Sequence, residues 1–254
     1  GGSEMRSRKY VYLFDEGSAE MRGRLGGKGA GLAEMTNLGL PVPPGFTITT
    51  EACNEYSVVK KELPAGLEEQ IQDALQSLEK KVGKTLGDMK NPLLLSVRSG
   101  AKISMPGMMD TVLNLGLNDK TVQALAAATG NERFALDCYR RFIQMFSDIV
   151  LHVEFNKFEE VLEKYQGRYR LQYDHELQPE HLKKVIEEYK EIITERTRSE
   201  FPQEPMDQLK KAVMAVFESW NNPRAKVYRK VNKIPDDLGT AVNVQAMVFG
   251  NMGD

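Results

Sequence analysis

Residues 92–117, PLLLSVRSGAKISMPGMMDTVLNLGL, decide how the rest of the chain is interpreted. A short, mostly apolar run at residues 93–97 follows a turn-prone Asn-Pro pair, which predicts a strand. Arg98 and Gly100 then stand at the expected carboxyl end of that strand, where open α/β sheets bind their ligands. An arginine beside glycines that expose backbone N–H groups suits a cluster of anionic oxygens such as a polyphosphate. A surface arginine next to a loop is the alternative interpretation of this stretch alone.

A second glycine-rich segment, LGGKGAGLAEM, covers residues 25–35. Its glycines surround Lys28 and lead into a helical pattern, so we expect a loop-to-helix junction where the backbone can approach a ligand closely. A helix N-terminus favours negative charge, and Lys28 would add a point charge within reach of a phosphate oxygen. The spacing is not that of a Walker A loop, because Gly29 follows the lysine. A flexible turn with a solvated lysine therefore stays open as the alternative.

The bulk composition is that of an ordinary soluble intracellular protein. The chain has 254 residues, enough for one or two domains, a net charge of −2 and 28% charged residues. No basic excess indicates a nucleic-acid partner, and no apolar run is long enough to span a membrane. Cys53 and Cys138 lie far apart in unlike contexts, so we expect reduced thiols and a cytoplasmic location, or an organelle if the source is eukaryotic.

Hydrophobic periodicity divides the chain into three parts. Strands are expected at residues 10–14 and near residue 46, and the apolar spacing of residues 66–82 predicts a helix. From about residue 118 to residue 200 the pattern predicts helices alone, which we interpret as a helical insertion with its own small core. Residues 240–249, TAVNVQAMVF, alternate as a strand should. Because one strand cannot stabilise a new sheet, we expect the chain to be a truncated piece of something longer.

Taken together, these segments resemble the N-terminal nucleotide-binding region of the pyruvate phosphate dikinases, and PVPPGFTITTEAC, RRFIQMFSDIV and NNPRAKVYRK add to the resemblance. It implies an α+β chain with an ATP-grasp-like fold. The N-terminal subdomain would comprise residues 8–113 and 200–239, interrupted by the helical insertion at residues 114–199. Residues 240–254 would be the first strand of a second ATP-grasp subdomain, the rest of which is missing.

The resemblance also implies an activity for the parent protein. Enzymes of this family use ATP, orthophosphate and pyruvate to form AMP, pyrophosphate and phosphoenolpyruvate. A histidine on a separate swivelling domain carries the phosphoryl group to a pyruvate-binding barrel, and we expect the parent protein to be a homodimer. Matched by motif, Lys28 and Arg98 would bind the ATP phosphates and serve catalysis. Gly107 and Thr111, in the PGMMDT loop, would add backbone and hydroxyl contacts to the phosphate chain.

On the last predicted strand, Gln245 and Met247 would meet adenine by side chain and backbone. The Mg²⁺ ligands, the phosphocarrier histidine and the barrel of the family are expected beyond residue 254, and no metal ligand is assigned within the chain. We therefore expect the chain to fold around its first subdomains but neither to bind ATP tightly nor to transfer phosphoryl groups. Calorimetry giving a micromolar ATP dissociation constant would contradict this expectation.

Two other classes of function stay open from the sequence. Phosphoenolpyruvate synthases are the nearest alternative family, although they usually continue the VRS motif differently and lack the SMPGMMDT form seen here. A non-catalytic nucleotide-binding module would keep the phosphate loops without the chemistry. In a variant of that hypothesis, the helical insertion makes the chain mainly a protein-interaction domain.

Overall fold

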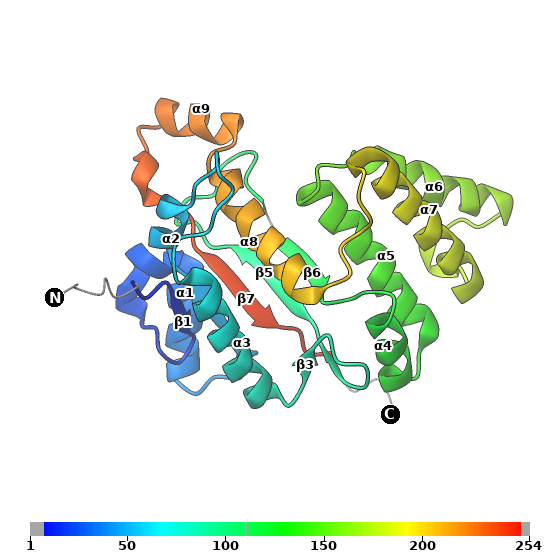
Figure 1. The fold of residues 1–254 in the computed structure, drawn as a ribbon, viewed down its shortest axis with the longest axis horizontal. Helices are drawn as coiled ribbons and strands as arrows, with labels where there is room; N and C mark the ends of the chain where they lie inside the picture. The colour runs from blue at the N-terminus through cyan, green and yellow to red at the C-terminus, as the bar shows by residue number, and fades with distance from the viewer. Residues whose placement is uncertain (1–7, 110, 250–254) are drawn as a thin grey trace. The chain divides into compact units, whose positions relative to one another are not determined.

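The computed structural model describes residues 8–109 and 111–249, and the chain divides into two compact units (Figure 1). Unit 1 consists of Gly1–Gly83, Ser96–Thr111 and Val213–Ala246, and unit 2 of Lys84–Leu95, Val112–Ala212 and Met247–Asp254. Helices and strands occur together, as the expected α+β class requires. Within the described ranges, none of the helices has the length and apolar character needed to cross a membrane.

The core of unit 1 is a sheet in which the strands follow the order β1-β2-β7-β5. Their bounds are Val11–Leu13 for β1, Gly45–Ile48 for β2, Val242–Ala246 for β7 and Leu95–Ser99 for β5. Both β1 and β7 pair antiparallel with β2. The β7 and β5 strands also run antiparallel, because the Gly100 N–H donates to the Ala241 carbonyl at one end, whereas Met247 donates to Leu94 at the other.

The β7 strand is an interior strand, which lies between β2 and β5 within the sheet of unit 1. Val244 stands opposite Phe46 in this pairing, and both side chains are fully buried. The physical reason is that β2 is buried along its whole length, so its second edge needs a strand to pair its backbone groups.

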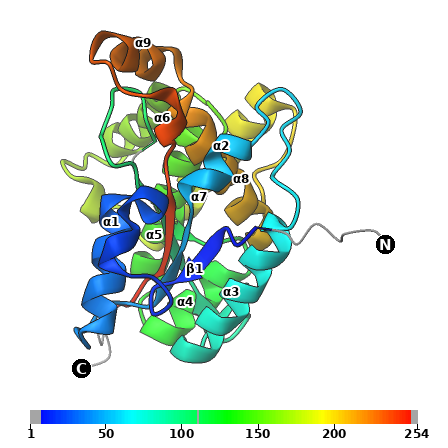
Figure 2. The same cartoon turned by 90° about the vertical axis from the view of Figure 1, so that its left-hand side faces the viewer.

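Helices cover both faces of the unit 1 sheet, with α1 on one side and α3 on the other (Figure 2). The helical elements of this unit are η1 (Ala19–Met21), α1 (Arg22–Asn37), α2 (Thr50–Glu55), α3 (Leu67–Val82), the second half of α8 (Pro205–Trp220), α9 (Pro223–Val231) and η3 (Asp236–Leu238). The α3 helix forms where the sequence predicted it, because residues such as Leu67, Ile71 and Leu78 recur at helical spacing and are all buried. Gly83, with a φ of 70°, ends that helix in the left-handed conformation.

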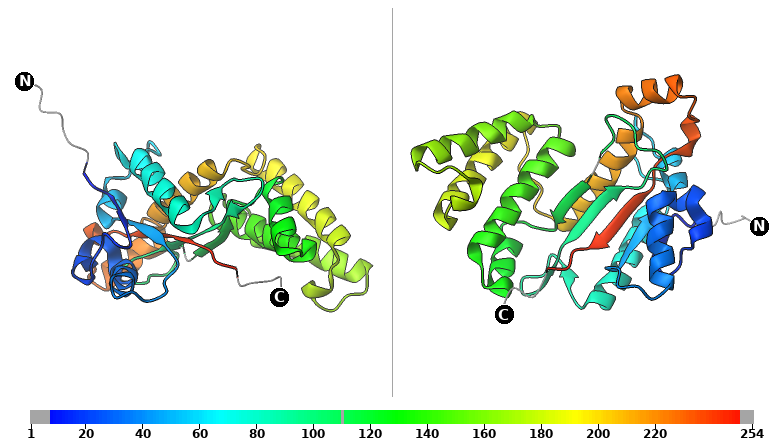
Figure 3. Two further views of the ribbon diagram at one scale, coloured as in Figure 1. Left: turned by 90° about the horizontal axis from the view of Figure 1, so that it is seen from below. Right: turned by 180° about the vertical axis from the view of Figure 1, so that it is seen from behind.

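Unit 2 is mostly helical, and the expected insertion at residues 114–199 lies within it; its helices α4–α7 group together in Figure 3. Aromatic rings fill part of its core, since Phe201 contacts Phe142 and Phe146 edge-on at 5.6 and 5.7 Å between ring centroids. Its elements are β3 (Thr85–Leu86) and β4 (Pro92–Leu93), which pair in parallel, β6 (Thr111–Leu115) from Val112 on, α4 (Thr121–Thr129), α5 (Glu132–Ile149), α6 (Phe155–Arg168), η2 (Asp174–Glu176), α7 (Pro179–Thr197) and the first half of α8.

A buried tyrosine makes the stability of unit 1 sensitive to alkaline pH. The Tyr10 hydroxyl donates to Glu55, and burial together with this bond raises the Tyr10 pKa from 10.0 to about 12. Because the folded state favours the neutral hydroxyl, the contribution of Tyr10 to the free energy of unfolding is fully present below pH 10. This contribution is lost as the pH rises to about 12. We expect Tyr10→Phe to lower the free energy of unfolding at pH 8, because the variant loses the hydrogen bond to Glu55, and to lower it by much less at pH 12. Urea titrations of the wild type and the variant at both pH values measure this difference. A difference in the free energy of unfolding that is the same at pH 8 and pH 12 would contradict the prediction.

Candidate anion-binding site

The glycine-rich segment forms a break inside α1 rather than a simple junction between a loop and a helix. The helix already begins at Arg22, and Gly26 interrupts it with a φ of 71° and a ψ of 172°. This conformation is open almost only to glycine. Helical geometry resumes after Gly26, so Gly27 and Lys28 lie in the first turn of a new helical segment. The first N–H groups of such a segment have no carbonyl partner within it and can bind an anion.

The break in α1 packs directly against the end of β5. A Cβ atom built on Gly26 would lie only 1.7 Å from the Gly100 carbonyl oxygen, so the two backbones are in contact. Lys28 follows Gly26 by two residues, and Arg98 precedes Gly100 by two. The structure therefore brings the two segments that the sequence analysis singled out to one place in unit 1.

The two cations differ in their surroundings. Lys28 is exposed, whereas Arg98 is partly buried near the end of β5. In the described part of the chain, the Arg98 Nε atom is buried and has no hydrogen-bond partner. A buried donor without a partner is costly, so this guanidinium is suited to an anionic ligand. Beside it, the Ser99 and Thr240 hydroxyls lie 3.0 Å apart and share a hydrogen bond.

The PGMMDT loop is held against the start of α9. Gly107 has a φ of 83°, and a Cβ atom there would lie 2.9 Å from the Asn222 Oδ1 atom. Asn222 caps α9 by accepting a hydrogen bond from the Arg224 N–H. Gly107 is exposed, which leaves its backbone accessible, and Thr111 is partly buried at the start of β6. Asp110 lies outside the described residues.

The two residues expected to meet adenine make other contacts. The Gln245 Nε2 atom donates to the Pro43 carbonyl at 3.0 Å, and the Gln245 side chain is partly buried. Met247 belongs to unit 2, where its N–H donates to the Leu94 carbonyl and its sulfur lies 3.1 Å from the Asn114 nitrogen. The bond to Leu94 uses the Met247 amide, so a backbone contact from Met247 to adenine would be made by its carbonyl.

A polar pair that was not predicted from the sequence lies below the glycine-rich segment. Thr47 on β2 and Asn243 on β7 are paired across the sheet and are 1% and 2% exposed. Alternation along β7 puts Asn243 on the opposite face from Val242 and Val244, where a polar residue is ordinary, so the sequence pattern carried no signal of its burial. The structure also has a cavity of about 150 Å³ near the end of β5, lined by Ser99, Ala101, Ser104, Met105, Met108 and Met109.

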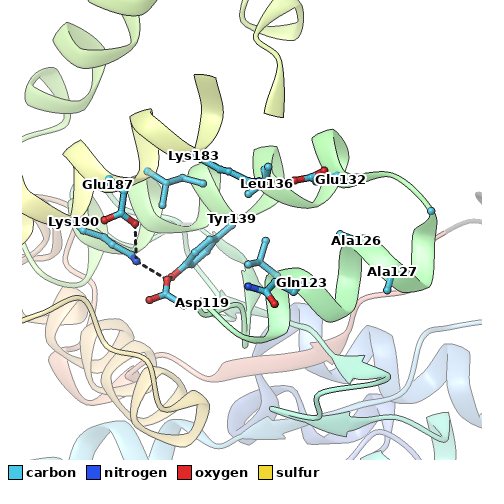
Figure 4. Close-up of a pocket in the computed structure, with 13 residues that line it drawn as sticks. Asp119, Gln123, Ala126, Ala127, Glu132, Leu136, Tyr139, Lys183, Glu187 and Lys190 are labelled. Atoms are coloured by element: carbon cyan, nitrogen blue, oxygen red, sulfur yellow. Dashed lines mark hydrogen bonds and ion pairs between the residues drawn. The ribbon is translucent and has the colours of Figure 1, made fainter. Parts of the chain in front are cut away.

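A pocket with a volume of about 760 Å³ lies in unit 2 (Figure 4). Its charged groups bind one another: the Lys190 Nζ atom lies 2.6 Å from Asp119, which also accepts from the Tyr139 hydroxyl at 2.7 Å. Burial and the bond to Asp119 raise the Tyr139 pKa. Lys183 is likewise paired with Glu132 at 2.9 Å. With each of these cations already paired to a carboxylate, this pocket is less suited to an anion than the surroundings of Arg98.

Comparison with known proteins shows the family of the chain. The family described as pyruvate phosphate dikinase, AMP/ATP-binding domain, matches residues 22–58 and 57–253. The chain belongs to this family. The resemblance found in the sequence is thereby confirmed, and the matched residues include all six that we singled out as candidates.

Curated relatives in the pyruvate phosphate dikinase family support the same assignment. The chain is 55% identical to the pyruvate, phosphate dikinase of Clostridium symbiosum and 57% identical to that of Rhizobium meliloti, over 97% of its length in each comparison. It is 53% identical to the chloroplastic pyruvate, phosphate dikinase 1 of Arabidopsis thaliana over 98% of its length. The chain spans 28%, 28% and 26% of these three relatives. All three carry the dikinase name rather than that of a phosphoenolpyruvate synthase.

Among residues 8–109 and 111–249, no group of three or more His, Cys, Asp and Glu side chains is placed to hold a metal ion. The buried Nε atom of Arg98, which has no partner there, is a donor suited to an anion.

Proposed function

We propose that unit 1 carries part of the ATP site of a pyruvate phosphate dikinase, in which Lys28 and Arg98 bind the phosphates. One observation carries this proposal, the backbone contact between Gly26 and Gly100. Gly26 precedes the start of a helical segment, and Gly100 follows the strand end that bears Arg98. Dipole and N–H groups from the first element and a guanidinium from the second are complementary to a polyphosphate.

The finer assignments belong to the same proposal. The fold would be of the ATP-grasp type, with Gly107 and Thr111 adding phosphate contacts and with Gln245 and Met247 contacting adenine. The whole protein would convert ATP, orthophosphate and pyruvate to AMP, pyrophosphate and phosphoenolpyruvate. Its further parts would be a swivelling phosphohistidine domain and a pyruvate-binding barrel, and it would act as a homodimer. Mg²⁺, held by ligands outside this chain, would neutralise phosphate charge.

The contribution of this chain to catalysis would be positioning and charge. Phosphoryl transfer requires little covalent chemistry from the protein, so rate enhancement depends on holding the phosphates in place and on stabilising their developing charge. Arg98 would offer a planar fork of donors that can hold two oxygens at once. Lys28, on the exposed turn, would act as a compact charge that follows the phosphate chain.

Titration of the ¹⁵N-labelled chain with tripolyphosphate tests this proposal by NMR, which detects weak binding. We expect chemical-shift changes at Gly27, Lys28 and Gly100 in the wild-type chain. Each charge-assisted contact is worth roughly 1.5–3 kcal/mol, so Arg98→Ala and Lys28→Ala should each weaken binding by about 10-fold to 100-fold. In each variant, the change in the free energy of unfolding should be smaller than the change in the free energy of binding.

Lys183→Ala is the matched control, because it removes one cation from unit 2 where Lys183 pairs with Glu132. It should leave the tripolyphosphate titration unchanged. Titration curves for Arg98→Ala and Lys28→Ala that superimpose on the wild-type curve would rule out the assignment of both residues. Adenosine, which has no phosphates, should give no change at Lys28.

A further inference from the structure

A row of three side chains crosses the sheet of unit 1 beneath the break in α1. Thr47 stands opposite Asn243 in the β2–β7 pairing. On the other side of β7, Gly100 bonds to Ala241, and the antiparallel register then puts Arg98, two residues back, opposite Asn243. Residues directly opposite in an antiparallel pair project to the same face. Asn243 therefore lies in the middle of the row, flanked by Thr47 and Arg98.

The glycines of the candidate site pack on this row. A Cβ atom on Gly29 would lie 3.1 Å from both the Asn243 Oδ1 atom and the Thr47 Cγ2 atom. A Cβ atom on Gly100 would lie 2.8 Å from the Asn243 Nδ2 atom. The two ends of one amide thus face the two backbone segments that meet at the site. The space that these glycines leave open is occupied by the Asn243 side chain.

Hydrogen bonding fixes one end of the amide and leaves the other end without a partner. The Thr47 hydroxyl donates to the Asn243 Oδ1 atom at 2.7 Å. In the described residues, neither the Asn243 Nδ2 atom nor the neighbouring Arg98 Nε atom has a hydrogen-bond partner, and both are buried. Two buried donors without partners reduce stability, and an apolar side chain at position 243 would remove one of them. The polar residue therefore needs a reason other than stability.

We propose that Asn243 is a positioning residue for the anion site, and that its neutral amide keeps Arg98 available for the ligand. The inference rests on the proposed function and extends it to a residue that does not touch the ligand. Thr47 orients the amide, the amide packs against both glycine segments, and its donor end cannot accept from the guanidinium of Arg98. A carboxylate of the same shape would accept from Arg98 and occupy the donors that the anion needs.

The decisive variant is Asn243→Asp, which has the same shape and adds a charge. We expect it to weaken tripolyphosphate binding by at least about tenfold in the NMR titration, because it competes for one charge-assisted contact. In an Arg98→Ala background the same substitution should have little further effect on affinity. Such non-additive effects on affinity would show that Asn243→Asp acts through Arg98 and not through general damage to the fold. Binding by Asn243→Asp that equals the wild type would overturn the inference.

A second variant and a control keep the test decisive. If Asn243→Asp does not fold, Thr47→Val removes the hydroxyl that orients the amide, and it should weaken binding several-fold. Gln208→Leu is the control, because Gln208 is fully buried and hydrogen-bonded in unit 2; it should lower stability and leave the affinity of the folded chain unchanged. Thr47→Val that binds normally, in a chain where Asn243→Asp is unfolded, would also overturn the inference.

Failure of the proposed function gives a different result. If the wild-type chain shows no response to tripolyphosphate, the ATP assignment falls, and the Arg98 Nε–H resonance then tests the positioning role by itself. Asn243→Asp should slow the hydrogen exchange of this group, because the new carboxylate accepts from it. Exchange at the wild-type rate in the folded variant would overturn the positioning role as well.

Discussion

Gly26→Ala is expected to abolish the stable fold of unit 1. The added Cβ atom would lie 1.7 Å from the Gly100 carbonyl oxygen, a backbone atom held by the strand that contains Arg98. A φ of 71° with a ψ of 172° adds strain of about 1–3 kcal/mol for any residue other than glycine. Steric overlap and strain together should cost more than about 4 kcal/mol, which is exceptional for one substitution. Urea denaturation followed by circular dichroism measures the loss.

Gly31→Ala in the same helix is the matched control. No atom lies within 4 Å of a Cβ built at Gly31, and its φ is not in the left-handed region. Alanine in the interior of a helix should raise stability by roughly 0.5–1 kcal/mol relative to glycine. Equal stability of Gly26→Ala and the wild type would show that the two backbones are not in contact. The argument for one anion site formed by both segments would then fail too.

Local patterns predicted the elements of this fold better than their pairing. Periodicity identified α3 and the strand that became β7, since burial of a helix or strand face depends on residues close in sequence. The partner of β7 was not predicted, because strand pairing is decided by contacts between residues such as Phe46 and Val244, nearly two hundred positions apart. Alternation showed that residues 240–249 form a strand, but it carried no information on which sheet receives it.

The candidate site shows the same limit at the level of single residues. Lys28 and Arg98 could be singled out because cations beside glycines have a chemical meaning at any position. The sequence did not indicate which of the several glycines breaks the helix. Gly26 is required because the Gly100 carbonyl, distant in sequence, occupies the place that a Cβ atom would take. Asn243 was missed for a related reason, since its significance arises from Thr47 and Arg98 on the two neighbouring strands.

Arg229→Ala is expected to have the second-largest effect on stability. The Arg229 side chain is 1% exposed, and its Cζ atom lies over the Trp220 ring, 4.3 Å from the ring centroid. Its Nε atom donates to Asp236 at 2.8 Å, and its Nη1 atom donates to the Trp220 carbonyl. Truncation would leave a cavity and a buried carbonyl without its donor, which together should cost about 3 kcal/mol. Trp220 is the only tryptophan of the chain, so its fluorescence reports on unfolding at this position.

Two further variants separate packing from charge at Arg229. Asp236 is 85% exposed, so its charge should contribute no more than about 1 kcal/mol, and Asp236→Asn should be nearly neutral. Lys226→Ala removes an exposed cation from the same helix and should change stability by less than about 0.5 kcal/mol. If Arg229→Ala were no worse than Lys226→Ala, the buried guanidinium would not hold α9 in place. Asn222, the cap of α9, contacts Gly107, so loosening this helix should also shift the NMR resonances of the PGMMDT loop.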